Sequence, residues 1–348
     1  MSHSHSLCPY GSNRVITPKN TLPQNADKLD NSLPINLNEI LIDVEYLNID
    51  AASFRQMSTA CHNSKQGIEL IIKNTVSERG KQHNPVTGSG GMLLGTVKEI
   101  GSKYPNHKKF IVGERIVSLV SLTLTPLFLK EINILDLDKD QAKVSGHAIF
   151  PPTSNLARVP KNIPLKVILA LFDVAGAPAQ TLQLVQQDHN VIIVGGGGKS
   201  GLLCAMAARD QLGTTGKLIA IEPNKEAAAR LDALNICDVI LEIDAQNPLM
   251  CKDAIAEITK NHLGDIVINC TNAPDTEMSC VLMTNNQGTV YFFSMATDFA
   301  KVALGAEGVS STAKLLIGNG YYPNNEMISL ALLERHENLF NLFHTLYS

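Results

Sequence analysis

The sequence predicts an α/β protein with two domains, a β-rich domain followed by a doubly wound parallel sheet of six strands. Three observations lead to this prediction. The chain has 348 residues, 44% of them apolar and 18% charged, which suits two hydrophobic cores. The second half repeats short apolar strands with amphipathic helical segments between them. The first half instead alternates or runs apolar between Gly, Pro and Asn breaks, with one clear helical segment.

The β-rich domain is predicted from four strand-like stretches. They are "EILIDVEYLNI", "GTVKEIG", "FIVGERIVSLVSLTL" and "ARVP", and the helical segment is "GIELIIKNTVSERGK". The stretch "IPLKVILALFDVAGAPAQTLQLV" has helical apolar spacing and is expected to bridge the two domains. We therefore predict a first domain over residues 1–168 and a second over residues 169–321. The amphipathic C-terminal segment, residues 322–348, is expected to return to the first domain.

Six apolar segments of the second domain predict its sheet. They are almost continuously apolar, which is typical of parallel strands covered by helices on both faces. They lie at residues 191–194, 218–221, 238–241, 265–270, 289–294 and 314–319.

The run "VIIVGGGGKSGLLCAMAARDQ" has two readings, a phosphate loop or a dinucleotide-binding turn. A phosphate loop ending in Lys-Ser requires a glycine at position 193, which is Ile193 in the first strand. The dinucleotide reading fits better, because a strand, a glycine turn and a helix N-terminus would face a pyrophosphate. Two registers satisfy it, Gly196-x-Gly198-x-x-Gly201 and Gly195-x-Gly197-x-x-x-Gly201. The predicted cofactor residues at this turn are Gly195, Gly197, Gly198, Lys199, Ser200 and Gly201.

A carboxylate after the second strand predicts which dinucleotide binds. In "KLIAIEP", Glu222 follows Gly201 by about twenty residues, where an acid can accept both ribose hydroxyls of NAD and would repel the 2′-phosphate of NADP. The predicted cofactor is therefore NAD. Cys270 and Thr271 end the fourth strand, where the adenosine is expected, and Ser294 ends the fifth, near the expected nicotinamide.

Composition excludes several other classes of protein. The net charge of −4 and the absence of tryptophan argue against nucleic acid as a partner. No secretory signal and no run of 18 apolar residues is present, so we expect a cytoplasmic protein without a membrane partner. Seven cysteines without a Cys-x-x-Cys pair make disulfides and a structural zinc site improbable.

Several landmarks resemble the medium-chain dehydrogenase/reductase superfamily. They are "GGMLLGTVKEIG" at 90–101, "VGERIV" at 112–117 and "YLNIDAAS". The resemblance implies a GroES-like β-rich catalytic domain, a Rossmann domain and dimers formed through the sheet edge of the Rossmann domain. Where the zinc enzymes have Cys, His and Cys, this chain has Asp50, Gly91 and approximately Val174, and their four-cysteine lobe is missing. One carboxylate does not hold a catalytic zinc, so no metal is expected.

Several longer sequence segments are similar to segments of the L-erythro-3,5-diaminohexanoate dehydrogenase family. They are "NPVTGSGGMLLGTV", "LVSLTLTPL", "LFDVAGAPAQ", "GGKSGLLC", "YFFSMATDFAKVALGAEGV" and "IGNGY". This resemblance implies a zinc-free, NAD-linked enzyme of anaerobic lysine fermentation. Its reaction would convert 3,5-diaminohexanoate, NAD⁺ and water into 5-amino-3-oxohexanoate, ammonium and NADH.

That chemistry requires a proton acceptor for the amine and groups that match the charges of a diamino acid. Asp50 stands where the resemblance places a zinc-binding cysteine, and its alternative role is a turn at the strand end. Asp173 in the bridging segment could meet a substrate ammonium or could serve as a cap or a structural ion pair. Glu78 and Arg79 could bind substrate charges, Arg79 as a bidentate carboxylate ligand, or could form a solvated helix end. Lys81 and His83 follow in the same stretch, and His83 is a conceivable base.

Two other functions remain open at this stage. A zinc-free quinone or enoyl reductase that uses NAD(P)H would keep the fold and change the substrate. A non-catalytic dinucleotide-binding protein would bind the cofactor without turnover.

Overall fold

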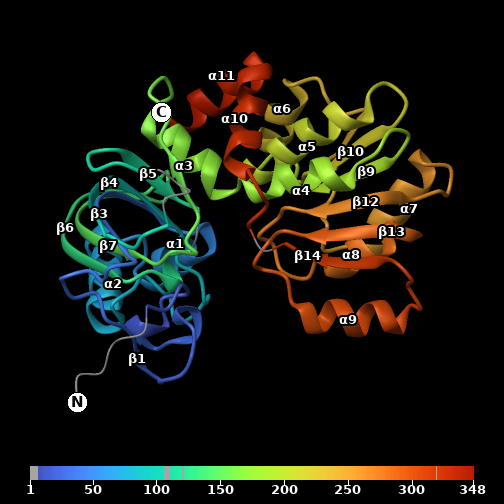
Figure 1. The fold of residues 1–348 in the computed structure, drawn as a ribbon. Coiled ribbons are helices and arrows are strands. Elements are labelled where there is room, and N and C mark those ends of the chain that lie inside the picture. Colours follow the sequence, from blue (N-terminus) through green and yellow to red (C-terminus); the bar gives the residue numbers. More distant parts are fainter. Residues whose placement is uncertain (1–6, 106–109, 120, 319) are drawn as a thin grey trace. The chain divides into compact units, whose positions relative to one another are not determined.

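The computed structural model describes residues 7–105, 110–119, 121–318 and 320–348 (Figure 1). It divides into two compact units, Met1–Asp173 with Tyr347 and Val174–Leu346 with Ser348. The boundary that we predicted after residue 168 falls inside helix α3 (Leu165–Asp173), which continues to the end of the first unit.

The first unit is built on an antiparallel sheet of six strands in the order β6-β7-β3-β4-β5-β8. A second small sheet pairs β1 with β2. The bounds are β1 (Val15–Thr17), β2 (Lys28–Leu29), β3 (Ile40–Asn48), β4 (Met92–Ile100), β5 (Arg115–Ser118), β6 (Leu127–Asp136), β7 (Gln141–Phe150) and β8 (Leu156–Arg158).

The sequence-based description of this unit was incomplete. Among the described residues of the stretch "FIVGERIVSLVSLTL", which exclude residue 120, the regular elements are the short strand β5 and the 3₁₀ turn η4 (Leu122–Leu124). Strands β6 and β7 were not predicted, although they form one of the most extensively paired hairpins of the sheet. Helix α1 (Ala51–Ala60) was also missed, because its ten residues offer a short apolar stripe in which Phe54 and Met57 are the buried apolar side chains. The predicted helix is α2 (Lys65–Arg79), which ends at Gly80 with φ 65°.

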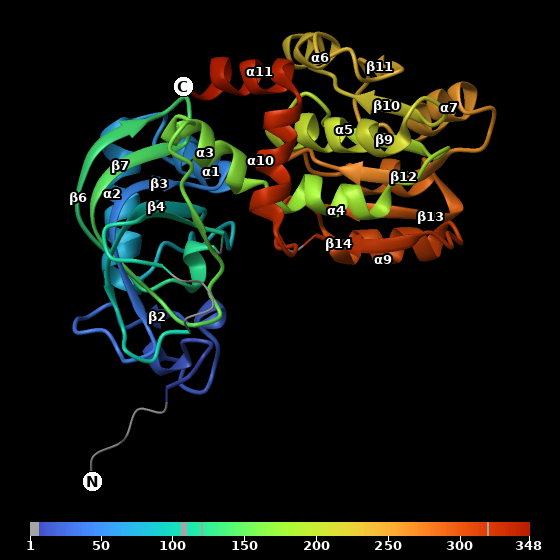
Figure 2. The same ribbon diagram turned by 45° about the horizontal axis from the view of Figure 1, so that its top comes forward.

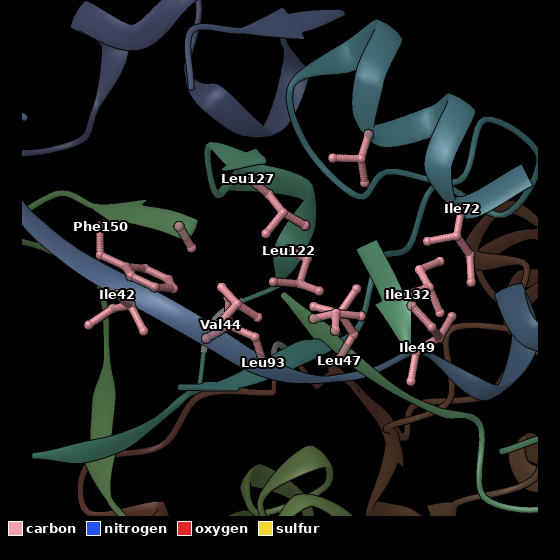
Figure 3. Close-up of a cluster of buried hydrophobic side chains, with 14 of the residues drawn as sticks. Ile42, Val44, Leu47, Ile49, Ile72, Leu93, Leu122, Leu127, Ile132 and Phe150 are labelled. Carbon is pink, nitrogen blue, oxygen red and sulfur yellow. The ribbon is translucent and has the colours of Figure 1, made fainter. Parts of the chain in front are cut away.

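The core of the first unit lies between this sheet and helix α2. Figure 3 shows Ile42, Val44 and Leu47 of β3 among side chains from neighbouring elements, including Leu122 and Ile72. The residues that alternate along β3 point into this cluster, as the period of a strand requires. The two 3₁₀ turns that precede the sheet are η1 (Ser12–Arg14) and η2 (Pro23–Asn25).

The second unit contains a parallel sheet of six strands in the order β11-β10-β9-β12-β13-β14 (Figure 2). The order reverses between β9 and β12, which is the arrangement of a doubly wound nucleotide-binding sheet. All six predicted strands are confirmed. Their bounds are β9 (Asn190–Val194), β10 (Lys217–Ile221), β11 (Val239–Leu241), β12 (Gly264–Asn269), β13 (Thr284–Phe292) and β14 (Lys314–Ile317).

Helices cover both faces of this sheet. Ile192 and Val194 of β9 share a core cluster with residues of α7 and α8, while α5 packs against β9 and β10. Because alternate strand residues face opposite sides, Val191 and Ile193 are buried on the other face. The helices are α4 (Gly176–Leu184), α5 (Lys199–Leu212), α6 (Lys225–Asp232), α7 (Pro248–Ile258), α8 (Glu277–Leu282), α9 (Phe299–Gly308), α10 (Asn325–Arg335) and α11 (Glu337–Tyr347).

The C-terminal segment does not follow our expectation that it returns to the first domain. Helix α10 packs on α4 and α5, so it belongs to the second unit. Leu332 and Leu333 are buried, and the Ser329 hydroxyl lies 3.4 Å from the carbonyl oxygen of Ala175. Burial of apolar side chains against α4 and α5 explains why α10 lies on the second unit.

Among the described residues, no single helix is both long enough and apolar enough to cross a membrane, and α3 with α4 reaches that length only as a bent pair.

A buried ion pair attaches the N-terminal segment of the first unit to the start of the sheet. Arg14 Nη2 lies 2.6 Å from Glu39 Oε2, and both side chains are about 95% buried or more. Arg14 also donates to the carbonyl oxygens of Ser32 and Pro34. Burial raises the pKa of Glu39, but hydrogen bonds from Arg14 and Asn36 outweigh this effect and hold that pKa below its usual value.

We expect Arg14→Met to lower the free energy of unfolding of the first unit by about 3–5 kcal/mol, because it leaves the Glu39 carboxylate buried without its partner. Urea denaturation measures this change. The control is Lys98→Met, which removes the exposed Lys98–Asp43 pair and should change stability by about 1 kcal/mol or less. Equal effects of the two substitutions would contradict the prediction.

Candidate functional site

The glycines of the turn between β9 and α5 have different structural roles. Gly195 has φ +79°, and a Cβ there would lie 2.9 Å from the backbone nitrogen of Thr271. A Cβ on Gly201 would overlap the carbonyl oxygen of Gly195, and one on Gly197 would overlap that of Ala227. Gly198 is exposed, and its Cβ position has only the Gly195 oxygen nearby, at 3.6 Å. Gly195 therefore makes the turn, Gly201 permits close packing, and Gly198 is the glycine that a ligand can approach.

The helix that follows presents an N-terminus suited to an anion. Gly198 is the N-cap of α5 and provides no side-chain acceptor. The first N–H groups of a helix lack acceptors within it, so here they remain available to a ligand. Lys199 begins α5 and is half-buried, while the next residue, Ser200, is buried. Both predicted residues thus lie in the first turn of this helix.

Glu222 lies against the glycine turn, as its position after β10 requires. Its Oε2 accepts a hydrogen bond from the Gly197 N–H at 3.1 Å, and its Oε1 accepts one from the Asn224 N–H at 3.1 Å. The side chain is buried. The structure therefore brings together Glu222 and Gly197, which lie 25 positions apart in the sequence.

The carboxyl ends of the neighbouring strands β12 and β13 lie next to the reversal of strand order, which falls between β9 and β12. Asn269 connects them: its carbonyl oxygen accepts from the Ser294 N–H at 3.2 Å, and its Oδ1 accepts from the Thr271 N–H at 3.2 Å. The Ser294 hydroxyl donates to Asn272 Oδ1 at 3.2 Å. The Cys270 thiol instead lies 3.8 Å from the Cys204 sulfur of α5.

The sequence analysis missed Asn269 and Asn272. Their signal was present, since both stand where the apolar strand β12 gives way to polar residues.

Asp50 is the N-cap of α1 in the first unit. Its Oδ1 accepts from the N–H groups of Ala52 at 3.0 Å and Ser53 at 3.2 Å, and from the Ser89 hydroxyl at 2.9 Å. These contacts agree with the alternative role that the sequence offered, a turn at the strand end. Its Oδ2 accepts no hydrogen bond within the described ranges, so one carboxylate oxygen is fixed and the other is available.

The other predicted charges of this unit do not join Asp50. Asp173 ends α3 and is half-buried. Glu78 is exposed on α2, and Arg79 donates from Nη1 to the carbonyl oxygen of His83 at 2.9 Å. Within the described ranges, the Asp50 carboxylate accepts hydrogen bonds from Ala52, Ser53 and Ser89. The Asp50 carbonyl oxygen accepts one from the Phe54 N–H.

Lys81 and His83 have unusual surroundings. Lys81 is fully buried, and its Nζ donates to the carbonyl oxygens of Pro23 at 2.7 Å and Gln24 at 3.2 Å. Burial, assisted by the charge of Arg79, lowers the pKa of Lys81 to about 8. Burial, with the charges of Lys81 and Arg79, lowers the pKa of His83 to about 4. His83 is therefore neutral at pH 7.

In the part of the chain that the structure describes, no group of three or more His, Cys, Asp or Glu side chains is arranged to hold a metal ion. All seven cysteines are free thiols.

An antiparallel β unit followed by a doubly wound sheet with a glycine turn defines the fold of a medium-chain dehydrogenase/reductase. Solved structures agree with this class. An alcohol dehydrogenase from Thermotoga maritima matches with a TM-score of 0.56 and 14% identity, covering 91% of this chain and 86% of that chain. At this identity the likeness shows the fold alone.

Sequence comparison identifies the family within this class. Residues 13–160 match the model of the L-erythro-3,5-diaminohexanoate dehydrogenase N-terminal domain. The L-erythro-3,5-diaminohexanoate dehydrogenase of Acetoanaerobium sticklandii is 43% identical over 340 residues, which cover 98% of this chain and 99% of that protein. The protein of the same name from Fusobacterium nucleatum subsp. nucleatum is also 43% identical over the same shares. The chain belongs to the L-erythro-3,5-diaminohexanoate dehydrogenase family.

The glycine turn generates a paired prediction. We expect Gly201→Ala to lower the free energy of unfolding by about 1–3 kcal/mol, because its methyl group overlaps the turn. Gly198→Ala should leave stability unchanged and weaken dinucleotide binding about tenfold or more, because its methyl group occupies the open face of the turn. Thermal unfolding and fluorescence titration with NADH and NADPH measure the two effects. Unchanged binding by Gly198→Ala would show that the ligand does not approach this glycine.

Proposed function

We propose that this chain catalyses the NAD-dependent oxidative deamination of L-erythro-3,5-diaminohexanoate in lysine fermentation. The substrates are the diamino acid, NAD⁺ and water, and the products are 5-amino-3-oxohexanoate, ammonium, NADH and one proton. The observation that carries the proposal is the 43% identity to proteins named for this substrate, which extends over both units of the chain. A quinone or enoyl reductase receives no comparable support.

NAD is the proposed cofactor, and it accepts the hydride when bound. Gly195, Gly197, Gly198 and Gly201 would shape the turn that receives its pyrophosphate, with first-turn groups of Lys199 and Ser200 beside it. Glu222 would accept the ribose hydroxyls, which supports NAD over NADP because a carboxylate repels a 2′-phosphate. Cys270, Thr271 and Ser294 would line the carboxyl ends of the strands.

The chemistry assigns separate tasks to the residues of the first unit. The ammonium on carbon 3 must lose a proton before hydride leaves, and Asp50 would bind this ammonium at Oδ2 and accept that proton. Arg79 would bind the substrate carboxylate. Asp173 and Glu78 are further candidates for the second ammonium. Water then adds to the iminium and ammonia leaves, so the reaction as proposed requires no metal.

The remaining proposals concern organisation. We propose a catalytic domain over residues 1–168 and a cofactor domain over residues 169–321, with the C-terminal helices α10 and α11 attached to the cofactor domain. We propose a homodimer formed through β14, the edge strand of the parallel sheet, whose Leu315 and Ile317 are exposed. A cytoplasmic location is supported by the free thiols, which persist in a reducing compartment.

The deciding assay uses chelator-treated protein with L-erythro-3,5-diaminohexanoate, and it compares NAD⁺ with NADP⁺. We expect reduction of NAD⁺ and formation of an equal amount of ammonium in the same tubes, because each hydride transfer leads to the release of one ammonium. Cofactor binding without turnover would leave the fold intact and remove the substrate assignment. Turnover of quinones or enoyl compounds instead would replace it.

Cofactor choice gives a second prediction. Glu222→Gln keeps an acceptor for the Gly197 N–H but loses the charge, so kcat/KM for NAD⁺ should fall about 10-fold to 100-fold. The value for NADP⁺ should fall less or rise, because the repulsion is removed. Steady-state kinetics with both cofactors measures the ratio. The control is Glu226→Gln, an exposed acid in the first turn of α6, which should change neither value.

A further inference from the structure

Three hydroxyl groups form a chain that ends on Asp50. The Ser89 hydroxyl donates to Asp50 Oδ1 at 2.9 Å. The Ser53 Oγ lies 2.6 Å from the Ser89 Oγ, and the Thr87 Oγ1 lies 2.5 Å from the Ser53 Oγ. Ser53 is fully buried, and Ser89 and Thr87 are half-buried. Distances this short indicate strong hydroxyl hydrogen bonds.

Each of these hydroxyl groups has one proton to donate, and this determines which group is the donor in each hydrogen bond. A carboxylate can only accept, so Ser89 must give its one hydroxyl proton to Asp50. Ser53 must then donate to Ser89, and Thr87 must donate to Ser53. The longer contact of 3.2 Å between Thr87 and Ser89 is left without a proton of its own. All three O–H dipoles therefore point toward the carboxylate.

The loop that carries two of these hydroxyls is held in place by its own hydrogen bonds. Asn84 Oδ1 accepts from the N–H of Val86 at 2.8 Å and of Thr87 at 3.3 Å. Its Nδ2 donates to Gln56 Oε1 of α1 at 3.0 Å. Gly88, with φ +72°, permits the tight turn between Thr87 and Ser89. The loop and α1 thus form one arrangement around Asp50.

The chain of hydroxyl groups contacts only one oxygen of the Asp50 carboxylate, Oδ1. Oδ1 already accepts three hydrogen bonds, two from backbone N–H groups and one from Ser89. Oδ2 accepts none from the described residues. A carboxylate fixed in this way presents one anionic oxygen in one direction, which suits a ligand with a single localised positive charge such as an alkylammonium group.

We propose that Ser53, Thr87 and Ser89 are positioning residues that hold Asp50 so that its Oδ2 binds the ammonium group of an amine substrate. This inference rests on the proposed function, because it takes Asp50 as the residue that receives the substrate amine. It goes further in assigning amine selectivity to a hydroxyl chain contributed by α1 and the 84–91 loop. The aligned dipoles stabilise the negative charge, and the bond from Ser89 prevents rotation of the carboxylate.

The test compares Ser89→Ala with Ser89→Thr. We expect Ser89→Ala to raise KM for L-erythro-3,5-diaminohexanoate about 10-fold to 100-fold, because a hydrogen bond to a charged group is lost. The KM for the cofactor should stay unchanged, since Asp50 takes no part in its binding. Ser89→Thr keeps the hydroxyl and should restore KM to within a few-fold of wild type. Thr87→Val, at the far end of the chain, should have a smaller effect.

Thr59→Ala is the matched control. Thr59 is an exposed hydroxyl residue on the same helix, and it donates to the Arg55 carbonyl oxygen outside the chain of hydroxyls. It should leave both KM values unchanged. Thermal unfolding and NADH titration of every variant separate loss of folding from loss of substrate binding.

Calorimetric binding of the diamino acid in the presence of NADH distinguishes the two proposals. Weak binding by Ser89→Ala, restored in Ser89→Thr, supports the positioning role whatever the turnover rate. Wild-type binding and KM in Ser89→Ala, together with loss of activity in Asp50→Asn, overturn the positioning role and leave the proposed function standing. Wild-type protein that neither binds nor turns over the diamino acid removes both.

Discussion

The close approach of α5 to the first strand of the parallel sheet is the constraint on which the cofactor site depends. Gly201 allows the helix to rest on the carbonyl oxygen of Gly195, and no residue with a Cβ fits there without displacement of the turn. This contact sets where the N-terminus of α5 points. The positive φ of Gly195 then leads the chain from strand to helix beside Thr271. The anion binding that we propose at this turn would depend on backbone geometry more than on any side chain.

Glu222 extends the same constraint to the second strand. Its carboxylate accepts the Gly197 N–H, so an acidic residue satisfies a buried backbone donor and stands at the turn at once. The role in structure and the proposed role in ribose recognition use the same carboxylate. The carboxylate of Asp50 in the first unit also combines two roles, since one of its oxygens caps α1 and the other stays available to a ligand.

The basic residues at and after the end of α2 contribute to the scaffold of the first unit. Lys81 is held by two backbone carbonyl oxygens, and Arg79 is engaged with the His83 carbonyl. Burial favours the neutral forms of Lys81 and His83, which limits the cost of placing them inside. Lys81 is fully buried on the carbonyl oxygens of Pro23 and Gln24, whereas Arg79 is only half-buried, so Arg79 stays the candidate for a substrate carboxylate.

The sequence by itself determined the six-stranded parallel sheet of the second unit and the glycine turn after β9. Six apolar segments, the glycine run and Glu222 are local signals, because strand periodicity and turn chemistry act within a few residues. Only the tertiary structure decided the pairing of β6 with β7, the placement of α10 on α4 and α5, and the separate tasks of the four glycines. The hydroxyl chain at Asp50 joins side chains more than 30 positions apart. No periodic pattern in the sequence predicts such contacts, because they arise when a loop folds back onto a helix. Only the folded chain brings Ser53, Thr87 and Ser89 together.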